Sequence, residues 1–410
     1  MPVQNAEIAG MFDQTAELLE IKGDNPFRSR AYRNAARVIE RLPKSITSLL
    51  KAGEDLSELV ANVLAHGPTR TTVVLRSGLQ VDLRVVPKAS YGAALMYFTG
   101  SKAHNIALRG LANDRGWKLN EYGLFAGKRR IAGVTEEEVY HKLGLAIIPP
   151  EMREDRGEVS LARTGHLPKL VTLADLGGDL HVHSNWSDGT VPIAEMAAAA
   201  RARGYAYMAL TDHSQHVTIA HGLDATRLGR QIDEIDKLSD KLDGFTVLKG
   251  TEVDILADGS LDLPDKILSR LDLVVAAVHY KFDLSRKAQT ERIIRAMDNR
   301  HVSIIAHPTG RLLGERDAYD VDMETIIAAA RERGCHLELN ADPDRLDLND
   351  IHVHAAKAAG VKIAISTDAH STSGFANMRF GVDQARRGWL EADDVINTLP
   401  LARLQKLLKR

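Results

Sequence analysis

Cysteine and long apolar segments are what this 410-residue sequence has least of. A single cysteine, Cys335, excludes an intrachain disulfide, and the apolar alternation around it (CHLELN) indicates a buried strand position rather than a nucleophile. No run of about 18 or more apolar residues occurs, and the N-terminal MPVQNAEIAG lacks the basic-then-apolar order of a signal peptide. These absences predict a protein that neither enters a membrane nor is exported, so we expect it in the cytoplasm.

The charge is also small, with a formal net value of -2 at pH 7. Residues 1–176 contain 24 Lys and Arg against 20 Asp and Glu, whereas residues 177–410 contain 29 against 35. An acidic C-terminal half is typical of a cation site lined by carboxylates. The slight basic excess of the front half permits a polyanionic partner but does not require one.

The front half combines a helical stretch with short strands. DNPFRSRAYRNAARVIERLP predicts a helix with Pro26 at its first position, where the missing amide hydrogen costs nothing. Residues 71–86 alternate around a Ser-Gly break, which predicts a β-hairpin, and mixed helix and strand follow. We expect four parts, a helical segment, a region of mixed helix and strand, a linker and a C-terminal domain, over residues 1–59, 60–148, 149–176 and 177–410.

After Gly178 the sequence changes to short apolar runs of strand length that alternate with helical stretches. There are seven such runs, at residues 179–183, 206–212, 246–253, 272–279, 302–307, 336–340 and 363–368. Repeated βα units indicate a parallel α/β fold, and polar residues at nearly every strand end favour a closed (β/α) barrel over an open sheet. The final helical stretch contains Pro400, so we expect it to break there.

Metal-ligating residue types end six of these seven runs. In a (β/α) barrel the strand ends and the loops after them form one functional face. Ionisable groups buried together are costly unless a cation pairs with them, and imidazole with carboxylate suits Zn, Mn or Fe. A lone H-x-H is common by chance, but two histidines at i and i+2 of a strand point to the same side and can share an ion. The candidate ligands are His181, His183, Asp188, His213, Glu252, His279, His307, Asp368 and His370.

These motifs, in this order, resemble the polymerase and histidinol phosphatase (PHP) domain family over roughly residues 177–375. The resemblance implies a distorted seven-stranded (β/α) barrel with three divalent metal ions. It assigns the first ion to His181, His183, Glu252 and Asp368, the second to Glu252, His279 and His307, and the third to Asp188, His213 and His370. Glu252 would bridge two ions through its two oxygens, which an imidazole cannot do. Such a cluster hydrolyses phosphoesters by activating water and holding phosphoryl oxygens, and Mn²⁺ is the expected activating ion.

Three further residues are candidates for a catalytic role. Asp212 precedes His213 and could either act directly or orient a ligand, the latter being favoured. Arg311 in HPTGR and Lys281 in HYKF follow the ligands of the second ion and could take a substrate phosphate. The alternative is that both are solvated loop charges.

The front half resembles bacterial family X DNA polymerases. The helical stretch resembles their small DNA-binding domain, and RSGLQVDLRVVPKASYGAALMYFTGSKAHNIALR resembles their palm and thumb. The expected helix-hairpin-helix segment of P-G-I-G type is absent, and so are the G-S-x-R-R and G-D-x-D stretches, as though the sequence jumped near Leu59. Only the third palm carboxylate remains, Asp82, and one aspartate cannot hold the two Mg²⁺ ions of nucleotidyl transfer. We therefore expect no templated polymerase activity.

The leading hypothesis is a metal-dependent nuclease of DNA repair. The resemblance implies a 3′-5′ exonuclease acting on single-stranded or primer-template 3′ ends, with activity at abasic sites or on 3′-phosphates. Basic residues of the front half could grip the DNA, or could be a solvated helix face: Arg30, Arg33, Arg37 and, in GSKAHN, Lys102. A small-molecule phosphatase of the histidinol-phosphate type is the second hypothesis. A DNA-binding scaffold with structural metals is the third, and the complete ligand set argues against it.

Overall fold

The computed structural model describes residues 9–10, 12–13, 15–16, 26–40, 60–67, 69–76, 78–239 and 241–409. The chain divides into two compact units, Met1–Leu167 and Pro168–Arg410. Among the described residues, no helix is long and apolar enough to cross a membrane.

The first unit begins with a helix and a three-stranded antiparallel sheet. Helix α2 (Pro26–Glu40) starts at the predicted proline, and the rest of the predicted helical segment lies outside the described residues. The predicted hairpin is confirmed as β2 (Arg70–Leu75) and β3 (Gln80–Arg84). Strand β1 (Val60–His66) pairs with β2 and was not predicted, because its sequence VANVLAH shows no apolar alternation.

A second group of elements in this unit follows the sheet. It consists of α4 (Tyr91–Thr99), α5 (Lys102–Asn113), the antiparallel strands β4 (Trp117–Asn120), β5 (Gly123–Ala126) and β6 (Arg129–Ala132), α6 (Glu136–Lys142) and α7 (Glu158–Thr164). Side chains cap the N-termini of α5 and α6. Ser101 accepts a hydrogen bond from the amide of His104, and Thr135 accepts one from the amide of Glu138.

Part of the segment expected to be a linker is folded onto the first unit. It contains α7, and Arg153 and Glu158 in it are buried. The imidazole Nδ1 of His104 donates to Glu158 Oε1 at 2.6 Å, and the Arg153 guanidinium donates to Glu136 Oε1 at 2.6 Å. Some charged residues of this segment therefore form buried ion pairs, whereas others are exposed to solvent. Sequence composition does not distinguish the two cases.

The second unit is a closed ring of parallel strands. These are β7 (Gly178–Val182), β8 (Tyr207–Leu210), β9 (Thr246–Lys249), β10 (Glu252–Asp254), β11 (Val274–Ala277), β12 (Val302–Ile305), β13 (His336–Asn340) and β14 (Ile363–Ser366). They form two parallel sheets, joined by bridges between His213 and Glu252 and between Val182 and Ala369. All seven predicted runs are strands, the third divided into β9 and β10, and the predicted barrel is confirmed.

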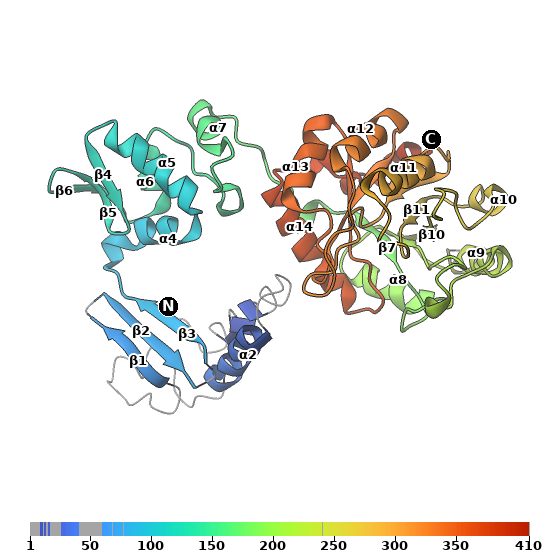
Figure 1. Ribbon diagram of the computed structural model, residues 1–410, viewed down its shortest axis with the longest axis horizontal. Helices are drawn as coiled ribbons and strands as arrows, with labels where there is room; N and C mark the ends of the chain where they lie inside the picture. The colour runs from blue at the N-terminus through green and yellow to red at the C-terminus, as the bar shows by residue number, and fades with distance from the viewer. Residues whose placement is uncertain are drawn as a thin grey trace. The chain divides into compact units, whose positions relative to one another are not determined.

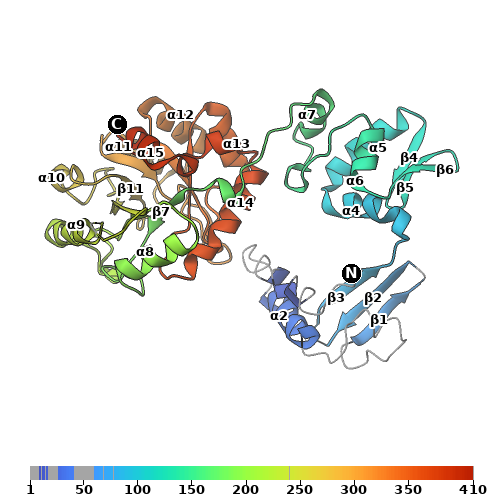
Figure 2. The ribbon, with the colours of Figure 1, turned by 180° about the vertical axis from the view of Figure 1, so that it is seen from behind.

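Helices surround these strands (Figure 1). They are α8 (Ile193–Ala202), α9 (Ala225–Ser239), α10 (Asp265–Leu268), α11 (Arg286–Met297), α12 (Met323–Arg333), α13 (Asp350–Ala359), α14 (Met378–Arg387) and α15 (Leu401–Leu408). Two 3₁₀ turns, Ala392–Asp394 and Ile396–Thr398, precede Pro400, which is the N-cap of α15. Figure 2 shows α15 at the end of the chain, and the predicted break is confirmed. Helix α14 was not predicted, because its arginines and glycine (MRFGVDQARR) conceal a buried face.

The core follows the two-residue period of the strands. In β8, Tyr207 and Ala209 pack in one cluster with Leu404 of α15, whereas Met208 and Leu210 pack in another that includes α8. Cys335 is buried beside β13, as predicted. The strands are therefore held on both faces, and their C-terminal ends are fixed with respect to one another.

Candidate metal centre

All nine predicted ligands lie at or just after the C-terminal ends of the barrel strands. Most are buried, whereas Asp188 and His370 keep about a third of their side chains exposed, at 33% and 37%. The backbone enters the left-handed region at His307 (φ 26°) and Asp368 (φ 55°). Non-glycine residues adopt this conformation rarely, and such strain gathers at functional sites.

Glu252 lies at the middle of the cluster and presents its two oxygens to different imidazoles. Its Oε1 is 2.9 Å from His307 Nε2 and 3.1 Å from His279 Nε2. Its Oε2 is 2.8 Å from His213 Nδ1 and 3.4 Å from His181 Nε2. The carboxylate is therefore placed as a bridging ligand would be.

A second carboxylate, Asp368, faces the H-x-H pair. Its Oδ1 is 3.0 Å from His183 Nε2 and 3.6 Å from His181 Nε2. Ligand atoms of these three residues lie within 4.8 Å of one another, close enough to hold one cation. This group contains three of the four residues assigned to the first ion.

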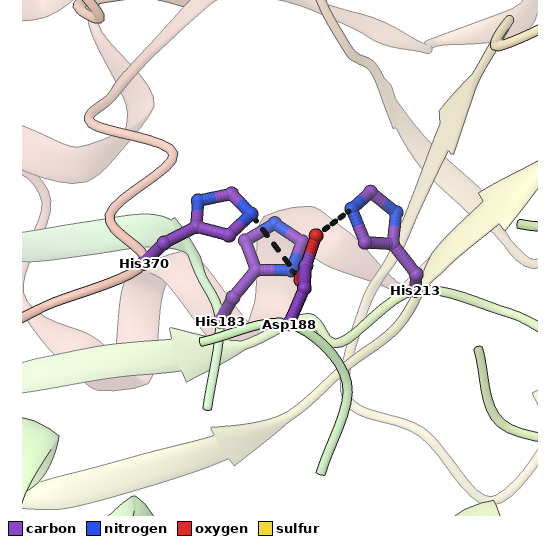
Figure 3. A group of neighbouring side chains, drawn as sticks. All are labelled: His183, Asp188, His213 and His370. Atoms are coloured by element: carbon purple, nitrogen blue, oxygen red, sulfur yellow. Dashed lines mark ion pairs between the residues drawn. The ribbon is translucent and has the colours of Figure 1, made fainter. Parts of the chain in front are cut away.

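Asp188 is the centre of a third group, drawn in Figure 3. Its Oδ1 is 3.3 Å from His370 Nε2, and its Oδ2 is 3.5 Å from His213 Nε2. His183 joins this group as well, since its Nδ1 is 3.8 Å from Asp188 Oδ1 and its ring stacks on that of His370. Ligand atoms of His213, Glu252 and His279 also lie within 4.8 Å of one another. His183 and His213 thus each belong to two groups, which the assignment to three separate ions did not predict.

The buried atoms of the cluster fit bound cations. Within the described part of the chain, eight buried atoms of the predicted ligands have no hydrogen-bond partner, and all but His307 Nδ1 lie within 3.8 Å of an atom of another predicted ligand. Unpaired buried polar atoms are costly, and cations would satisfy them together. The atoms are His181 Nε2, His183 Nδ1 and Nε2, His213 Nδ1, Glu252 Oε2, His279 Nε2, His307 Nδ1 and Asp368 Oδ1.

Carboxylates behind the cluster orient its imidazoles. His181 Nδ1 donates to Glu338 Oε1 at 2.7 Å, and His279 Nδ1 donates to Asp254 Oδ1 at 2.6 Å. Each bond fixes the tautomer in which Nε2 is free to bind a metal. Neither carboxylate was predicted from the sequence, although Glu338 lies in HLELN, the one predicted strand without a predicted ligand.

The imidazoles of the cluster differ in the direction of their pKa shifts. Burial lowers the pKa of His183 to about 3, assisted by the neighbouring His370 and His213, so His183 is neutral at pH 7. Burial would also lower the pKa of His213, but Glu252 and Asp188 overcome it and raise this pKa to about 10. Asp188 likewise outweighs burial at His370 and raises its pKa to about 9. Burial would raise the pKa of Glu252, but the histidines hold it well below its ordinary value.

Metal binding beside Asp188 is expected to release protons. His213 and His370 carry protons at pH 7 in the metal-free protein, since their pKa values are raised to about 10 and about 9. A cation must displace both, so its affinity should fall about tenfold per pH unit for each proton as the pH is lowered from 8 to 6. Calorimetric titration of the metal-free chain with Mn²⁺, in buffers of different ionisation enthalpy, measures the released protons. An affinity independent of pH over this range would contradict the prediction.

Asp212 is fully buried but faces away from the cluster. Its carboxylate accepts four hydrogen bonds: from the amide and hydroxyl of Ser184 (2.8 and 2.7 Å), the hydroxyl of Ser187 (2.5 Å) and Gln231 Nε2 (2.6 Å). Asp212 therefore anchors the loop after β7, which carries Asp188. This geometry supports an orienting role over a direct catalytic one.

Of the two predicted phosphate-binding cations, neither contacts the cluster. Arg311 donates from Nε to the carbonyl of Arg345 at 2.8 Å and from its guanidinium to the carbonyl of Leu346. Lys281 is exposed and has a left-handed backbone (φ 51°). The cation at the cluster is instead Arg345, whose Nε lies 3.5 Å from Asp368 Oδ2. Sequence reasoning missed it because Arg345 follows β13, whose end was not recognised as part of the site.

The predicted nucleic-acid and polymerase residues all lie in the first unit. Arg30 and Arg37 are exposed and Arg33 is half-buried on α2, while Lys102 is exposed at the first turn of α5. Asp82 on β3 accepts hydrogen bonds from Thr72 Oγ1 at 2.5 Å and from Arg70 at 3.2 Å. Thr72 and Arg70 together lower its pKa, and Asp82 is the only acidic residue between positions 60 and 84.

Comparison with known protein families identifies three domains. The family models that match are the helix-hairpin-helix domain over residues 3–60, the DNA polymerase beta thumb over residues 94–154 and the PHP domain over residues 179–342. The first match shows that the helical segment belongs to a helix-hairpin-helix domain family, although a P-G-I-G stretch does not occur in it. The match to a thumb ends at residue 154, inside the segment expected to be a linker and just before α7.

Individual proteins also match parts of the chain. The chain is 42% identical over 363 residues to "DNA polymerase/3'-5' exonuclease PolX" of Bacillus subtilis (strain 168), a match that covers 87% of this chain and 63% of that protein. It is 29% identical over 242 residues to the protein named "Probable phosphatase" in Thermoanaerobacter sp. (strain X514), which covers 56% of this chain and 94% of that protein. The solved histidinol phosphate phosphatase of Lactococcus lactis has a TM-score of 0.37 and 17% identity, covering 51% of this chain and 93% of its own.

The matched region of the Bacillus protein thus spans less than two thirds of its length. It nevertheless runs through most of this chain, and the helix-hairpin-helix, thumb and PHP domains occur in one order. The chain is therefore a relative of the bacterial family X DNA polymerases that carry a C-terminal PHP domain.

Proposed function

We propose that the barrel hydrolyses phosphodiester bonds of DNA as a 3′-5′ exonuclease that depends on divalent cations. The observation that carries the proposal is the position of Glu252, one oxygen facing His279 and His307 and the other facing His213 and His181. A carboxylate shared between two sets of imidazoles is the ligand arrangement of a multinuclear hydrolase.

Different residues of this chain have different roles in the proposed reaction. Divalent cations held by the cluster would supply Lewis-acid activation of water and of the phosphoryl oxygens. Glu338 and Asp254 hold His181 and His279 in the required tautomers, and Asp212 fixes the loop that carries Asp188. Three ions, with Mn²⁺ as the activating one, are part of the proposal, as is their assignment to particular ligands.

DNA as the substrate is supported by the first unit. Its domains match those of a DNA polymerase, and the Bacillus relative is named as a 3′-5′ exonuclease. We propose that Arg30, Arg33, Arg37 and Lys102 contact the phosphate backbone, so that their removal weakens binding of every DNA sequence alike. Activity at abasic sites or on 3′-phosphates belongs to the same proposal.

Degradation of end-labelled DNA tests the function. The purified chain with Mn²⁺ is expected to shorten single-stranded and primer-template DNA from the 3′ end, and His183→Ala is expected to abolish this activity. The 5′-labelled strand then gives a ladder, whereas attack from the 5′ end would give labelled mononucleotide. Rapid hydrolysis of a small phosphomonoester without DNA degradation would instead support a small-molecule phosphatase, the function in the name of the Thermoanaerobacter relative.

The same primer-template DNA with deoxynucleoside triphosphates is expected to give no extension in Mg²⁺ or Mn²⁺. Asp82 is the one carboxylate of its sheet, and its oxygens are already engaged by Thr72 and Arg70. Two Mg²⁺ ions on a triphosphate need several carboxylates together. Extension products longer than the primer would contradict this expectation, and a His183→Ala background prevents degradation from hiding them.

Arg345 is expected to hold the substrate phosphate in place of the predicted Arg311. A guanidinium beside the cluster repels metal ions, so its position is explained by an anion that binds there. Arg345→Gln should reduce kcat/KM for DNA about 100-fold while the metal content stays constant. Arg333→Gln, on the exposed end of α12, is the matched control. Lost metal in Arg345→Gln would instead indicate a structural role for Arg345.

A further inference from the structure

The loop between β8 and α9 leaves the metal centre directly after His213 and has a fixed stem. The amide of Ser214 donates to the carbonyl of Glu252 at 2.9 Å, and the amide of Leu223 donates to the carbonyl of His213 at 2.7 Å. At the far side of the stem a Cβ on Gly222 would lie 1.9 Å from the carbonyl oxygen of Ser214, so only glycine fits. The stem thus holds the loop tip in place relative to the ligands.

The tip of this loop exposes an apolar side chain. Ile219, in the 3₁₀ turn Thr218–Ala220, is 91% exposed, more than any other large hydrophobic residue of the described chain. The next most exposed isoleucine, Ile351 on α13, is 60% exposed. A single exposed isoleucine needs no explanation, but this one lies six residues after the ligand His213, on a loop whose stem is bonded to the backbone of His213 and Glu252.

An imidazole lies on the same loop as Ile219. The exposed ring of His216 packs on Tyr280, with ring centroids 4.3 Å apart, and its amide donates to Asp262 Oδ2 at 2.9 Å. Tyr280 follows the ligand His279, and the Arg292 guanidinium covers it at 4.8 Å. The two rings, tilted by 48°, are thereby held next to the ligand His279, and His216 is the exposed one of the pair.

We propose that His216 and Ile219 form a nucleobase subsite for the DNA strand whose phosphodiester is cleaved. A base stacks on the His216 imidazole, and Ile219 packs against the neighbouring base and keeps the two apart. Aromatic rings serve as platforms for bases of any sequence, and isoleucine is among the residues that wedge between bases. The exposed Lys281, directly after Tyr280, adds positive charge for the backbone of the same strand. This inference rests on the proposed function.

The test separates base contacts from backbone contacts. The KM for degradation of an oligothymidylate is measured with Mn²⁺, together with the inhibition constant of an abasic oligomer of equal length, which keeps the phosphates and lacks the bases. The variant His216→Ala with Ile219→Ser is expected to raise the KM about tenfold and to leave the inhibition constant unchanged. Ile351→Ser, an exposed isoleucine away from the loop, is expected to change neither.

Some results would overturn the nucleobase subsite, and another would reject the proposed function. An unchanged KM in the double variant overturns the subsite, and so does an equal rise of the KM and the inhibition constant, because that result indicates a loss of structure or of backbone contacts. Absence of oligothymidylate degradation by the intact chain would reject the proposed function itself, before any variant is compared. Melting temperatures of the intact chain and both variants verify that each is folded.

Discussion

Glu252→Gln is expected to lower the rate of DNA hydrolysis by at least about 1,000-fold. Glutamine keeps the size of the side chain but replaces one oxygen by an amide nitrogen, which donates hydrogen bonds and cannot bind a cation. The carboxylate lies between four imidazoles, at 2.8 to 3.4 Å, so the substitution removes a ligand on one side or the other whichever way the amide turns. The measurements are the initial rate on 3′-labelled DNA and the metal content by elemental analysis.

The control for this substitution is Glu332→Gln on α12, where 74% of the carboxylate side chain is exposed. It loses the same charge without touching the cluster, and its rate should match that of the intact chain. Metal content and rate together decide the role of Glu252. Loss of bound metal with loss of activity indicates a ligand, as proposed, whereas full metal content with full activity would show that Glu252 does not bridge.

Asp212→Ala is expected to destabilise the barrel by about 3 kcal/mol or more and to weaken metal binding beside Asp188. Four hydrogen bonds from Ser184, Ser187 and Gln231 end on this one carboxylate, and all lie in the buried interior. Alanine would leave their donors without acceptors, each at a desolvation cost, and would release the loop from Ser184 to Asp188. Denaturant unfolding in the presence of a chelator measures the effect on folding alone, because bound metal would otherwise add its own stabilisation.

Asp233→Ala on α9 provides the comparison for Asp212→Ala. Its side chain is 63% exposed and pairs with Arg270 at the surface, where ion pairs contribute little. The free energy of unfolding should therefore change by no more than about 0.5 kcal/mol. If Asp212→Ala were equally harmless, the four hydrogen bonds would not be what holds the loop.

Much of the barrel could be predicted from local patterns. Strand-length apolar runs, helical spacing between them, and prolines at positions 26 and 400 fix elements through interactions of residues close in sequence. Elements without a clear local pattern were missed. Strand β1 lacks alternation, α14 hides its buried face among arginines, and α7 lies in a charged segment that the chain uses for buried ion pairs.

That the candidate ligands lie together in one cluster could be predicted from the sequence. Histidines and carboxylates at consecutive strand ends must meet at one end of a parallel barrel, because such strands all run in the same direction. The same rule could have suggested Glu338, since HLELN is also a strand and its alternate residues share a face. It could not identify Asp254 as the partner of His279, which depends on how β10 and β11 are aligned.

By itself, the sequence determined which residue types end the strands, and it predicts that one palm carboxylate remains, Asp82. Only the tertiary structure decided how the ligands are shared: His183 and His213 each face two groups because the closed ring brings both nitrogens of each ring within reach of a carboxylate. It also placed Arg345 at the cluster and Arg311 behind it. Such contacts join residues far apart in the chain, so they exist only once the barrel has closed.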